Sequence, residues 1–309
     1  MKTVFMYAGQ GSQHVGMGKD FYEKSDAYRA TFDANENYKA YQELMENGPE
    51  EELKKTENTQ PCMAAFAAGV TDALVEKGIK PEGCVGLSLG EYGALYGAGV
   101  LSKKDYVDTV AFRGAAMAEA AKGLECSMSA ILGLDSAKVT EAVESVTEGY
   151  VVLVNYNCPG QYVICGDESA VAAAEEKAKE LGAKRAVRLN VSGPFHTKYM
   201  APASVKLREY IDGIEMNKPK VPVAMNVTGD FLGDADTRAL LEEQIKSGVH
   251  FEDDIKRFLD EGADTFVEIG PGKTLAGFVK KIAKEYGKDV TTFSIDSYED
   301  YEKVVESLA

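Results

Sequence analysis

The amino-acid sequence predicts an α/β fold with a parallel sheet, into which a smaller domain is inserted. Near both ends of the chain, short apolar runs alternate with segments of helical spacing, which is typical of a parallel sheet covered by helices. In the middle of the chain the predicted order is β-α-β-β-α-β, the order of a split ferredoxin-like unit. A length of 309 residues suits one large domain or two modest ones.

The first elements follow from apolar runs and from the glycines that end them. Residues 2–7 form an apolar run before a glycine-rich turn, as expected for a buried parallel strand. Residues 59–78 repeat apolar side chains at spacings of three and four and end at a glycine, which predicts a long helix. Residues 84–86 then predict a short strand, and residues 89–96 a second helix.

The middle of the chain predicts the inserted domain, which we place at residues 126–193. The large domain then comprises residues 1–125 and 194–309. A strong turn signal, Asn-Cys-Pro-Gly at 157–160, separates two of the strands. The predicted strands are 129–134, 151–156, 162–165 and 185–191, and the predicted helices are 136–146 and 170–181.

Composition and charge exclude several classes of function. A net charge of −16 argues against a nucleic-acid partner, because phosphate binding needs clustered Lys and Arg. No segment has the roughly 18 uninterrupted apolar residues of a membrane helix. The five cysteines are irregularly spaced without a CxxC pair, which favours free thiols and no zinc site. We therefore expect a cytoplasmic protein with no bound metal and no membrane partner.

The strongest local signal for chemistry is Gly86-Leu87-Ser88-Leu89-Gly90, a G-x-S-x-G motif between a predicted strand and a predicted helix. Such a turn lifts the serine hydroxyl above the sheet, and its sharpness requires glycine on both sides. The alternative is a capping box, in which Ser88 and Glu91 only cap the helix. A cap does not explain the two glycines, so the motif favours a nucleophile.

Only three histidines are present to serve as a base for this serine: His14, His196 and His250. A histidine in a loop is more often a surface residue than a catalyst. His196 is favoured because it follows a predicted strand end and a Gly-Pro turn, and because it comes after the serine in the chain. No carboxylate stands out as a third member, so we expect a Ser-His dyad.

Six motifs in order give a more specific indication than any one of them. The series resembles the malonyl-CoA:acyl-carrier-protein transacylases and the related acyltransferase domains of fatty acid and polyketide synthases. The resemblance covers about residues 3–280 and implies an α/β-hydrolase-like large domain. The motifs are YAGQGSQ at 7–13, GLSLGEY at 86–92, Arg113-Gly114, NYNCPGQ at 155–161, VSGPFH at 191–196 and VEIGPG at 267–272.

The resemblance implies that Ser88 carries the acyl group and that His196 acts as general base and then as general acid. It implies an oxyanion hole made by the backbone N–H groups of Gln10 and Leu89. It also implies that Arg113 holds the free carboxylate of the substrate, since a guanidinium binds a carboxylate through two hydrogen bonds. The alternative for Arg113 alone is a residue on a helix surface.

Further expectations concern the acyl pocket and the reaction partners. Phe195 resembles the bulky residue of malonyl-selective members, and Met117 lies one helical turn beyond the arginine, where it either lines the pocket or packs in the core. The implied partners are malonyl-CoA and an acyl carrier protein that brings its own phosphopantetheine, so no cofactor is expected. We also expect a monomer.

The chain departs from the family pattern at three positions. Leu87 stands where the family often has histidine, and Ala8 stands where many members have proline. His250 occupies a site where glutamine or asparagine often orients the catalytic histidine. We expect His250 to take over that contact, provided that a backbone carbonyl makes it.

Two motifs and one basic cluster remain outside this interpretation. The glycine-rich turn at 9–14 lacks the third glycine of G-x-G-x-x-G, and Gly272-Lys273-Thr274 lacks the first glycine of a P-loop. A basic group near the C-terminus is either a solvated helix face or a docking patch for the carrier; it comprises Lys280, Lys281, Lys284 and Lys288. The rival functions are a hydrolase with the same serine turn and a subunit that only binds the carrier.

Overall fold

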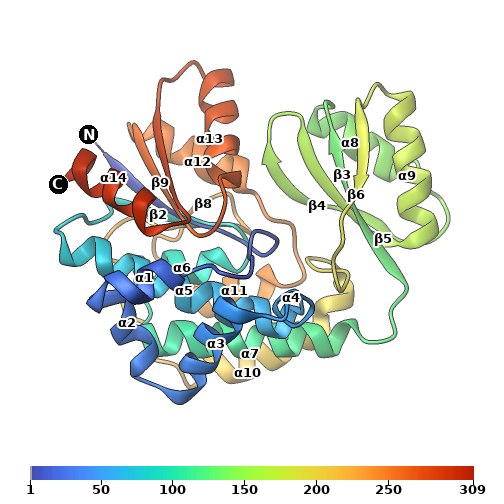
Figure 1. Ribbon diagram of the computed structural model, residues 1–309. Helices are drawn as coiled ribbons and strands as arrows, with labels where there is room; N and C mark the ends of the chain where they lie inside the picture. The colour runs from blue at the N-terminus through green and yellow to red at the C-terminus, as the bar shows by residue number, and fades with distance from the viewer. Residues whose placement is uncertain (1) are drawn as a thin grey trace.

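The computed structural model describes residues 2–309, which form two separate main sheets with helices packed around them (Figure 1). The larger part, at the left and bottom of the view, contains both ends of the chain. The smaller part, at the upper right, contains the green and yellow middle segment. The α/β fold class with a parallel sheet and a second, ferredoxin-like unit is confirmed.

The first sheet is entirely parallel, as predicted, and its strand order is β10-β9-β1-β2. The predicted strand at 2–7 is β1 (Thr3–Tyr7), and the strand predicted at 84–86 is β2 (Gly83–Gly86). The other two strands come from the C-terminal part of the chain, β9 (Thr265–Ile269) and β10 (Thr291–Ile295). Strands from both ends of the sequence and the strand that leads into the serine motif therefore belong to the same sheet.

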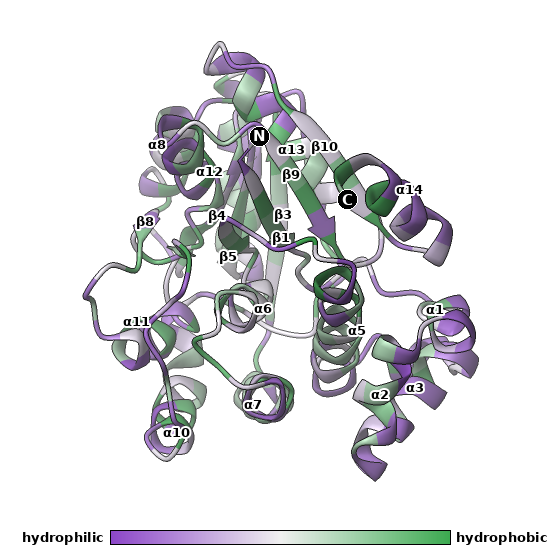
Figure 2. Cartoon of the chain, turned by 90° about the vertical axis from the view of Figure 1, so that its left-hand side faces the viewer, coloured by the Kyte–Doolittle hydropathy of each residue, from purple (hydrophilic) through white to green (hydrophobic). Residues whose placement is uncertain are grey.

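Each face of this sheet is buried in a different apolar cluster, because successive side chains of a strand point to opposite faces. In β1, Phe5 and Tyr7 join the cluster that includes α5 (Thr56–Glu76), α6 (Gly90–Gly97) and α7 (Lys103–Ala121). Val4 and Met6 join the cluster with α12 (Phe251–Asp260) and α13 (Thr274–Glu285). Figure 2 shows the resulting green, hydrophobic strands at the centre of the large domain.

The second sheet is antiparallel with the strand order β4-β5-β3-β6, the order of a ferredoxin-like unit. Two helices, α8 and α9, share an apolar cluster with one face of it. The opposite face contributes Met128 and Ala130 to the core of the large domain. Its elements are β3 (Cys126–Leu132), α8 (Ser136–Glu144), β4 (Val151–Cys158), β5 (Gln161–Asp167), α9 (Glu168–Glu180) and β6 (Arg185–Arg188). The domain boundaries at 126 and 193 stay a prediction.

Several helices have no counterpart among the predicted elements. Four of them precede the long helix α5 and pack beside it: α1 (Lys19–Lys24), α2 (Asp26–Asp33), α3 (Glu36–Asn47) and α4 (Glu50–Leu53). The segment after the small domain is mainly helical rather than an alternation of strands and helices. It contains a 3-10 turn (Lys198–Met200), α10 (Ala201–Ile211), the two-residue strands β7 (Ala224–Met225) and β8 (Asp230–Phe231), and α11 (Thr237–Gln244). The chain ends in α14 (Tyr298–Leu308).

Within residues 2–309, no helix is both long enough and apolar enough to cross a lipid bilayer.

Candidate active site

Ser88 lies in a tight turn between β2 and α6, and its backbone has a φ of 56°. A left-handed backbone at a non-glycine residue costs of order 1–3 kcal/mol and is found where the surrounding structure holds it in place. Both flanking glycines are required. A Cβ on Gly86 would lie 2.0 Å from the backbone of Gly90, and a Cβ on Gly90 would lie 2.0 Å from the carbonyl oxygen of Tyr7.

His196 reaches this serine from a segment 108 residues later. Its Nε2 lies 2.7 Å from Ser88 Oγ, a hydrogen-bond distance, and the imidazole is buried. His196 also has a left-handed backbone, with a φ of 62°; within residues 2–309, Ser88 and His196 are the two non-glycine residues with positive φ. Backbone strain is therefore concentrated at the pair that the sequence singled out.

A main-chain carbonyl orients the imidazole. His196 Nδ1 lies 2.8 Å from the carbonyl oxygen of Gln244, the last residue of α11. Such a carbonyl has no partner within its own helix, and it carries the partial negative charge of the helix C-terminus. A carbonyl only accepts, so Nδ1 holds the proton and Nε2 presents its lone pair to Ser88 Oγ.

The expected orienting role of His250 is therefore wrong. His250 lies at the N-terminus of α12, where its ring stacks on Tyr156 with centroids 4.4 Å apart and its Nδ1 lies 3.6 Å from Asp253. The sequence indicated His250, whereas the residue that makes the orienting contact is Gln244, six positions earlier in the chain. A backbone carbonyl makes this contact, so its position is not marked by any residue type.

The capping-box alternative for Ser88 does not fit the geometry. Leu89 is the N-cap residue of α6, and no side chain caps this helix. Ser88 Oγ instead contacts His196 and, at 3.1 Å, an Arg113 nitrogen. The carboxylate of Glu91 accepts a hydrogen bond from the backbone of Asn226, so it does not close a capping box either.

Arg113 extends from α7 into the core, with 1% of its surface exposed, so it is not a helix-surface residue. One terminal nitrogen donates to Gln60 Oε1 at 2.8 Å, and the other donates to Ser88 Oγ and, at 3.0 Å, to Gln244 Oε1. The guanidinium also lies 5.4 Å from the ring centre of Tyr92.

This buried cation has no carboxylate partner among the ion pairs of residues 2–309, and its Nε–H has no acceptor there. A buried charge without a counter-ion is costly, and burial lowers the pKa of Arg113. The charge of Glu91 acts in the opposite direction, but burial raises the pKa of Glu91 itself to about 8. The site thus offers an anion a positive charge directly beside the serine hydroxyl.

Two backbone N–H groups beside the serine are free to stabilise negative charge. Neither Gln10 nor Leu89 uses its N–H in a hydrogen bond with any of the described residues. The Gln10 segment is held in place because its side-chain amide donates to Thr56 Oγ1 at 3.0 Å. Leu89 is the N-cap residue of α6, and the helix dipole favours an anion at this end.

Met117 and Phe195, the expected pocket residues, are both buried. Met117 Sδ accepts a weak hydrogen bond from Gln60 Nε2 at 3.6 Å, and the oxygen of the same amide contacts Arg113. Phe195 precedes His196 directly and packs close to Gly193. Both side chains thus lie near the dyad, while their contact with an acyl group stays a prediction.

Comparison with known proteins agrees with this geometry. The model of the acyl transferase domain family matches residues 4–299. The chain belongs to the acyl transferase family. It is 43% identical to the malonyl CoA-acyl carrier protein transacylase of Bacillus subtilis (strain 168), over 99% of this chain and 97% of the relative. It is 38% identical to the protein of the same name from Staphylococcus aureus (strain MRSA252), over 97% of each.

Solved structures of this acyltransferase family have the same fold along the whole chain. A malonyl CoA-acyl carrier protein transacylase from Clostridium perfringens superposes with a TM-score of 0.94 at 39% identity, covering 100% of this chain and 97% of the other. A malonyl-transacylase in complex with a type II polyketide-synthase acyl-carrier protein gives a TM-score of 0.93 at 33% identity. That match covers 99% of this chain and 100% of the other.

Sequence reasoning missed three residues of the acyltransferase site: Gln60, Gln244 and Asn226. Gln60 and Gln244 hold the guanidinium of Arg113, and Gln244 also donates to the carbonyl oxygen of Ser88 at 2.8 Å. Gln60 and Gln244 are fully buried glutamines on helices, a placement that requires a polar partner. Burial becomes visible only with the fold, so the sequence alone offers no signal for them.

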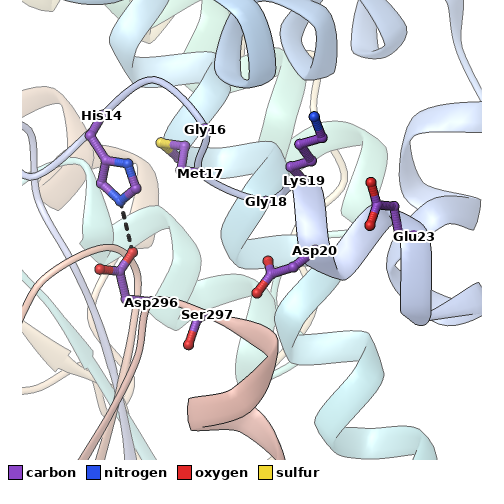
Figure 3. Close-up of a pocket in the computed structure, with 9 residues that line it drawn as sticks. All are labelled: His14, Gly16, Met17, Gly18, Lys19, Asp20, Glu23, Asp296 and Ser297. Carbon is purple, nitrogen blue, oxygen red and sulfur yellow. Dashed lines mark hydrogen bonds and ion pairs between the residues drawn. The ribbon is translucent and has the colours of Figure 1, made fainter.

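The acyltransferase also has a surface hollow of about 350 Å³ away from the dyad (Figure 3). His14 lines it and pairs with Asp296 at 3.0 Å, so this histidine is engaged outside the dyad. The four lysines near the C-terminus are exposed on α13 and just beyond it, which leaves both interpretations of that group open. Within residues 2–309, no cluster of His, Cys, Asp and Glu suited to a metal ion is present.

Proposed function

We propose that this acyltransferase moves a malonyl group from malonyl-CoA to the phosphopantetheine thiol of an acyl carrier protein, through a malonyl-Ser88 intermediate. Relatives that are 33–43% identical to this chain are named as malonyl transacylases, which supports the proposal. One of these relatives is bound to an acyl-carrier protein. The carrier in that complex belongs to a polyketide synthase, whereas the resemblance implies a carrier of fatty acid synthesis. Transfer of a malonyl group to the carrier thiol is the same reaction in both pathways, and we propose the fatty acid pathway for this chain.

The observation that carries the proposal is the unpaired cation beside the nucleophile. Arg113 lies 3.1 Å from Ser88 Oγ and has no carboxylate partner among the described residues. A malonyl thioester has a carboxylate at the end opposite to its reacting carbonyl, so one molecule supplies both the electrophile and the missing anion. A plain acyl chain would leave the guanidinium unpaired, at a cost of about 1–3 kcal/mol.

In the first half-reaction, Ser88 Oγ attacks the thioester carbonyl carbon while its proton passes to Nε2 of His196. The carbonyl oxygen becomes an oxyanion, which the N–H groups of Gln10 and Leu89 are free to stabilise. The C–S bond then breaks, and the imidazolium returns the proton to the CoA sulfur. Malonyl-Ser88 and free CoA are the products.

The second half-reaction repeats these steps in reverse order with a different thiol. His196 takes the proton of the phosphopantetheine thiol, and the thiolate attacks the carbonyl carbon of the malonyl ester. The C–O bond to Ser88 then breaks, and the imidazolium returns the proton to Ser88 Oγ, which leaves the malonyl group as a thioester on the carrier. Arg113 holds the malonyl carboxylate throughout. The proposal requires no cofactor on this chain, and Met117 and Phe195 are proposed to bound the acyl pocket.

Pre-steady-state release of CoA tests the proposal against hydrolysis. Malonyl-CoA alone is expected to release one CoA per active site in a burst, followed by slow turnover until holo carrier protein is added. A hydrolase would turn over continuously with water and gain nothing from the carrier. Ser88→Ala should abolish both the burst and the transfer; full transfer by this variant would show that Ser88 is not the nucleophile.

Cellular location and assembly are part of the same proposal. All five cysteines are free thiols and four of them are buried, which agrees with a reducing cytoplasm. All seven residues proposed for the site lie on one chain, so we propose a monomer as the active form. Sedimentation at the concentrations of the burst assay tests that state.

A further inference from the structure

Asn226 lies directly behind the nucleophile turn, although 138 residues separate it from Ser88 in the chain. It follows the short strand β7 and is completely buried. The reaction steps described above do not use it. Its side chain is nevertheless the centre of a polar cluster that the large domain encloses on every side.

The side-chain amide of Asn226 spans the turn that carries the nucleophile. Its Oδ1 accepts the N–H of Ser88 at 2.8 Å, and its Nδ2 donates to the carbonyl oxygen of Gly86 at 2.8 Å. A backbone N–H only donates and a carbonyl only accepts, so these two partners fix the orientation of the amide. One planar group therefore sets the separation of the peptide units on both sides of Leu87.

Other elements hold Asn226 itself in place. Its second Nδ2 hydrogen points to Asp254 Oδ2 at 2.9 Å, on α12. Its backbone N–H donates to the carboxyl group of Glu91 on α6, and its carbonyl accepts the N–H of His250 at 2.8 Å. Asn226 is thus fixed to α6, to α12 and to the turn that carries the nucleophile.

The same contact determines which N–H groups are left for the oxyanion. The N–H of Ser88 is bonded to Asn226, whereas the N–H of Leu89 has no acceptor among the described residues. The oxyanion hole that we propose consequently depends on this bond. Without Asn226, the Ser88 N–H would be unpaired and the left-handed φ of Ser88 would lose its support from behind.

We propose that Asn226 is a positioning residue, which holds Ser88 in its reactive backbone conformation and reserves the Leu89 N–H for the oxyanion. The proposal rests on Ser88 being the nucleophile. Burial raises the pKa of both surrounding acids, that of Glu91 to about 8, which favours their uncharged forms around the amide at neutral pH.

The test compares Asn226→Ala with the wild-type chain in two assays. One is the rate of the CoA burst at saturating malonyl-CoA, and the other is the labelling of Ser88 by a fluorophosphonate, which needs no malonyl binding. We expect both rates to fall by tenfold to about a hundredfold, the effect of a nucleophile displaced by an ångström or less. The KM of malonyl-CoA should stay within about threefold, because Arg113 is intact.

Two further variants separate positioning from general loss of stability. Thr31→Ala removes a buried hydroxyl of α2, which accepts a hydrogen bond from Lys103 at the start of α7 and takes no part in the hydrogen bonds of the nucleophile turn. This variant should leave both rates unchanged at a similarly reduced melting temperature. Asp254→Asn keeps an oxygen for Nδ2 and should retain both rates within about threefold. Asn226→Ser replaces the alanine variant if that chain does not fold, with the same expected loss.

The proposal is overturned if a folded Asn226 variant reacts like Thr31→Ala in both assays. It is also overturned if neither Asn226 variant folds while Thr31→Ala does, since Asn226 would then be required only for folding. A failure of the proposed function looks different: the wild-type chain itself would carry no fluorophosphonate on Ser88 and give no burst.

Discussion

At the scale of single residues, the site depends on two strained residues that contact each other. Ser88 and His196 both have a left-handed backbone, and their side chains meet at 2.7 Å. Strain of this kind persists only where many contacts fix it. Glycines 86 and 90 make the turn possible, and the Gln244 carbonyl fixes the imidazole. The guanidinium of Arg113 adds a buried positive charge beside Ser88 Oγ, which we propose selects the substrate.

Arg113 is expected to set the preference for a carboxylated acyl group. Arg113→Ala should lower kcat/KM for malonyl-CoA by about 10²-fold or more, because the malonyl carboxylate loses its buried partner. The kcat/KM for acetyl-CoA should stay within a few fold. Arg113→Lys keeps the charge but loses the planar guanidinium that forms two hydrogen bonds, so its kcat/KM for malonyl-CoA should lie between those of the wild-type chain and Arg113→Ala. Equal losses for both thioesters would show that Arg113 acts on the nucleophile instead.

The pH dependence of acylation should reflect the burial of His196. Burial, and then the charge of Arg113, lower the pKa of this imidazole to about 4. The base is active when neutral, so the burst rate should hold as pH falls through 6.5 and decline only towards pH 4. The measurement is the burst rate from pH 4 to 8. A decline centred at 6.5 would mean that His196 is not held in this buried form.

Sequence reasoning found these residues where the residue type itself was the signal. Glycine on both sides of Ser88, a histidine after a Gly-Pro turn, and Arg113 within an ordered motif series were all recognisable in the sequence. The group that orients His196 was not recognisable, because it is a main-chain carbonyl, which a residue of any type can supply. Reasoning from side chains therefore chose His250, which stacks on Tyr156 instead.

At the scale of elements, the turn between β2 and α6 leaves no room for a side chain at either of its glycines. Its glycines allow the helix to start close under the end of β1. The strands that surround it were predictable because they are short, apolar runs ended by glycine. Helices α1–α4 were not, because one to three side chains of each are buried and three of the four helices have eight residues or fewer. Their helical form depends on packing against α5.

Gly90→Ala is expected to disrupt the turn, since its Cβ would lie 2.0 Å from the Tyr7 carbonyl oxygen. The melting temperature and the Ser88 labelling rate should both fall. The matched control is Gly277→Ala in α13, where a Cβ meets nothing within 4 Å. That change should leave labelling intact and stabilise the helix by up to about 1 kcal/mol. Similar behaviour of the two variants would mean that the turn tolerates a side chain.

Glu91→Gln should stabilise the chain in alkaline solution. Burial raises the pKa of Glu91 from 4.5 to about 8, so the folded chain binds more protons than the unfolded one between these values. Its carboxyl group therefore costs stability as pH rises from 4.5 to 8. Glutamine keeps the acceptor for the Asn226 N–H without this cost. Thermal unfolding at pH 5 and pH 8 should show a gain at pH 8 alone; a loss at pH 8 would show that the charge is needed.

At the scale of the whole molecule, the fold gathers distant segments at the carboxyl ends of β1 and β2. Such ends are where open parallel sheets bind their ligands. Gln10 follows β1 and Ser88 follows β2, while His196 comes directly after the inserted domain in the chain. The contact from Gln244 to Ser88 spans 156 residues. The sequence order of motifs cannot give such distances, so the family resemblance, rather than local pattern, indicated that they converge.

The most direct test of the whole account is the mass of the intact chain after brief incubation with malonyl-CoA, acetyl-CoA or methylmalonyl-CoA. Peptide mapping then locates any adduct. The account predicts one malonyl group on Ser88, little or no acetyl or methylmalonyl adduct, and none on Ser88→Ala. A stable malonyl group on a different residue, or transfer to the carrier without any acylated chain, would contradict it.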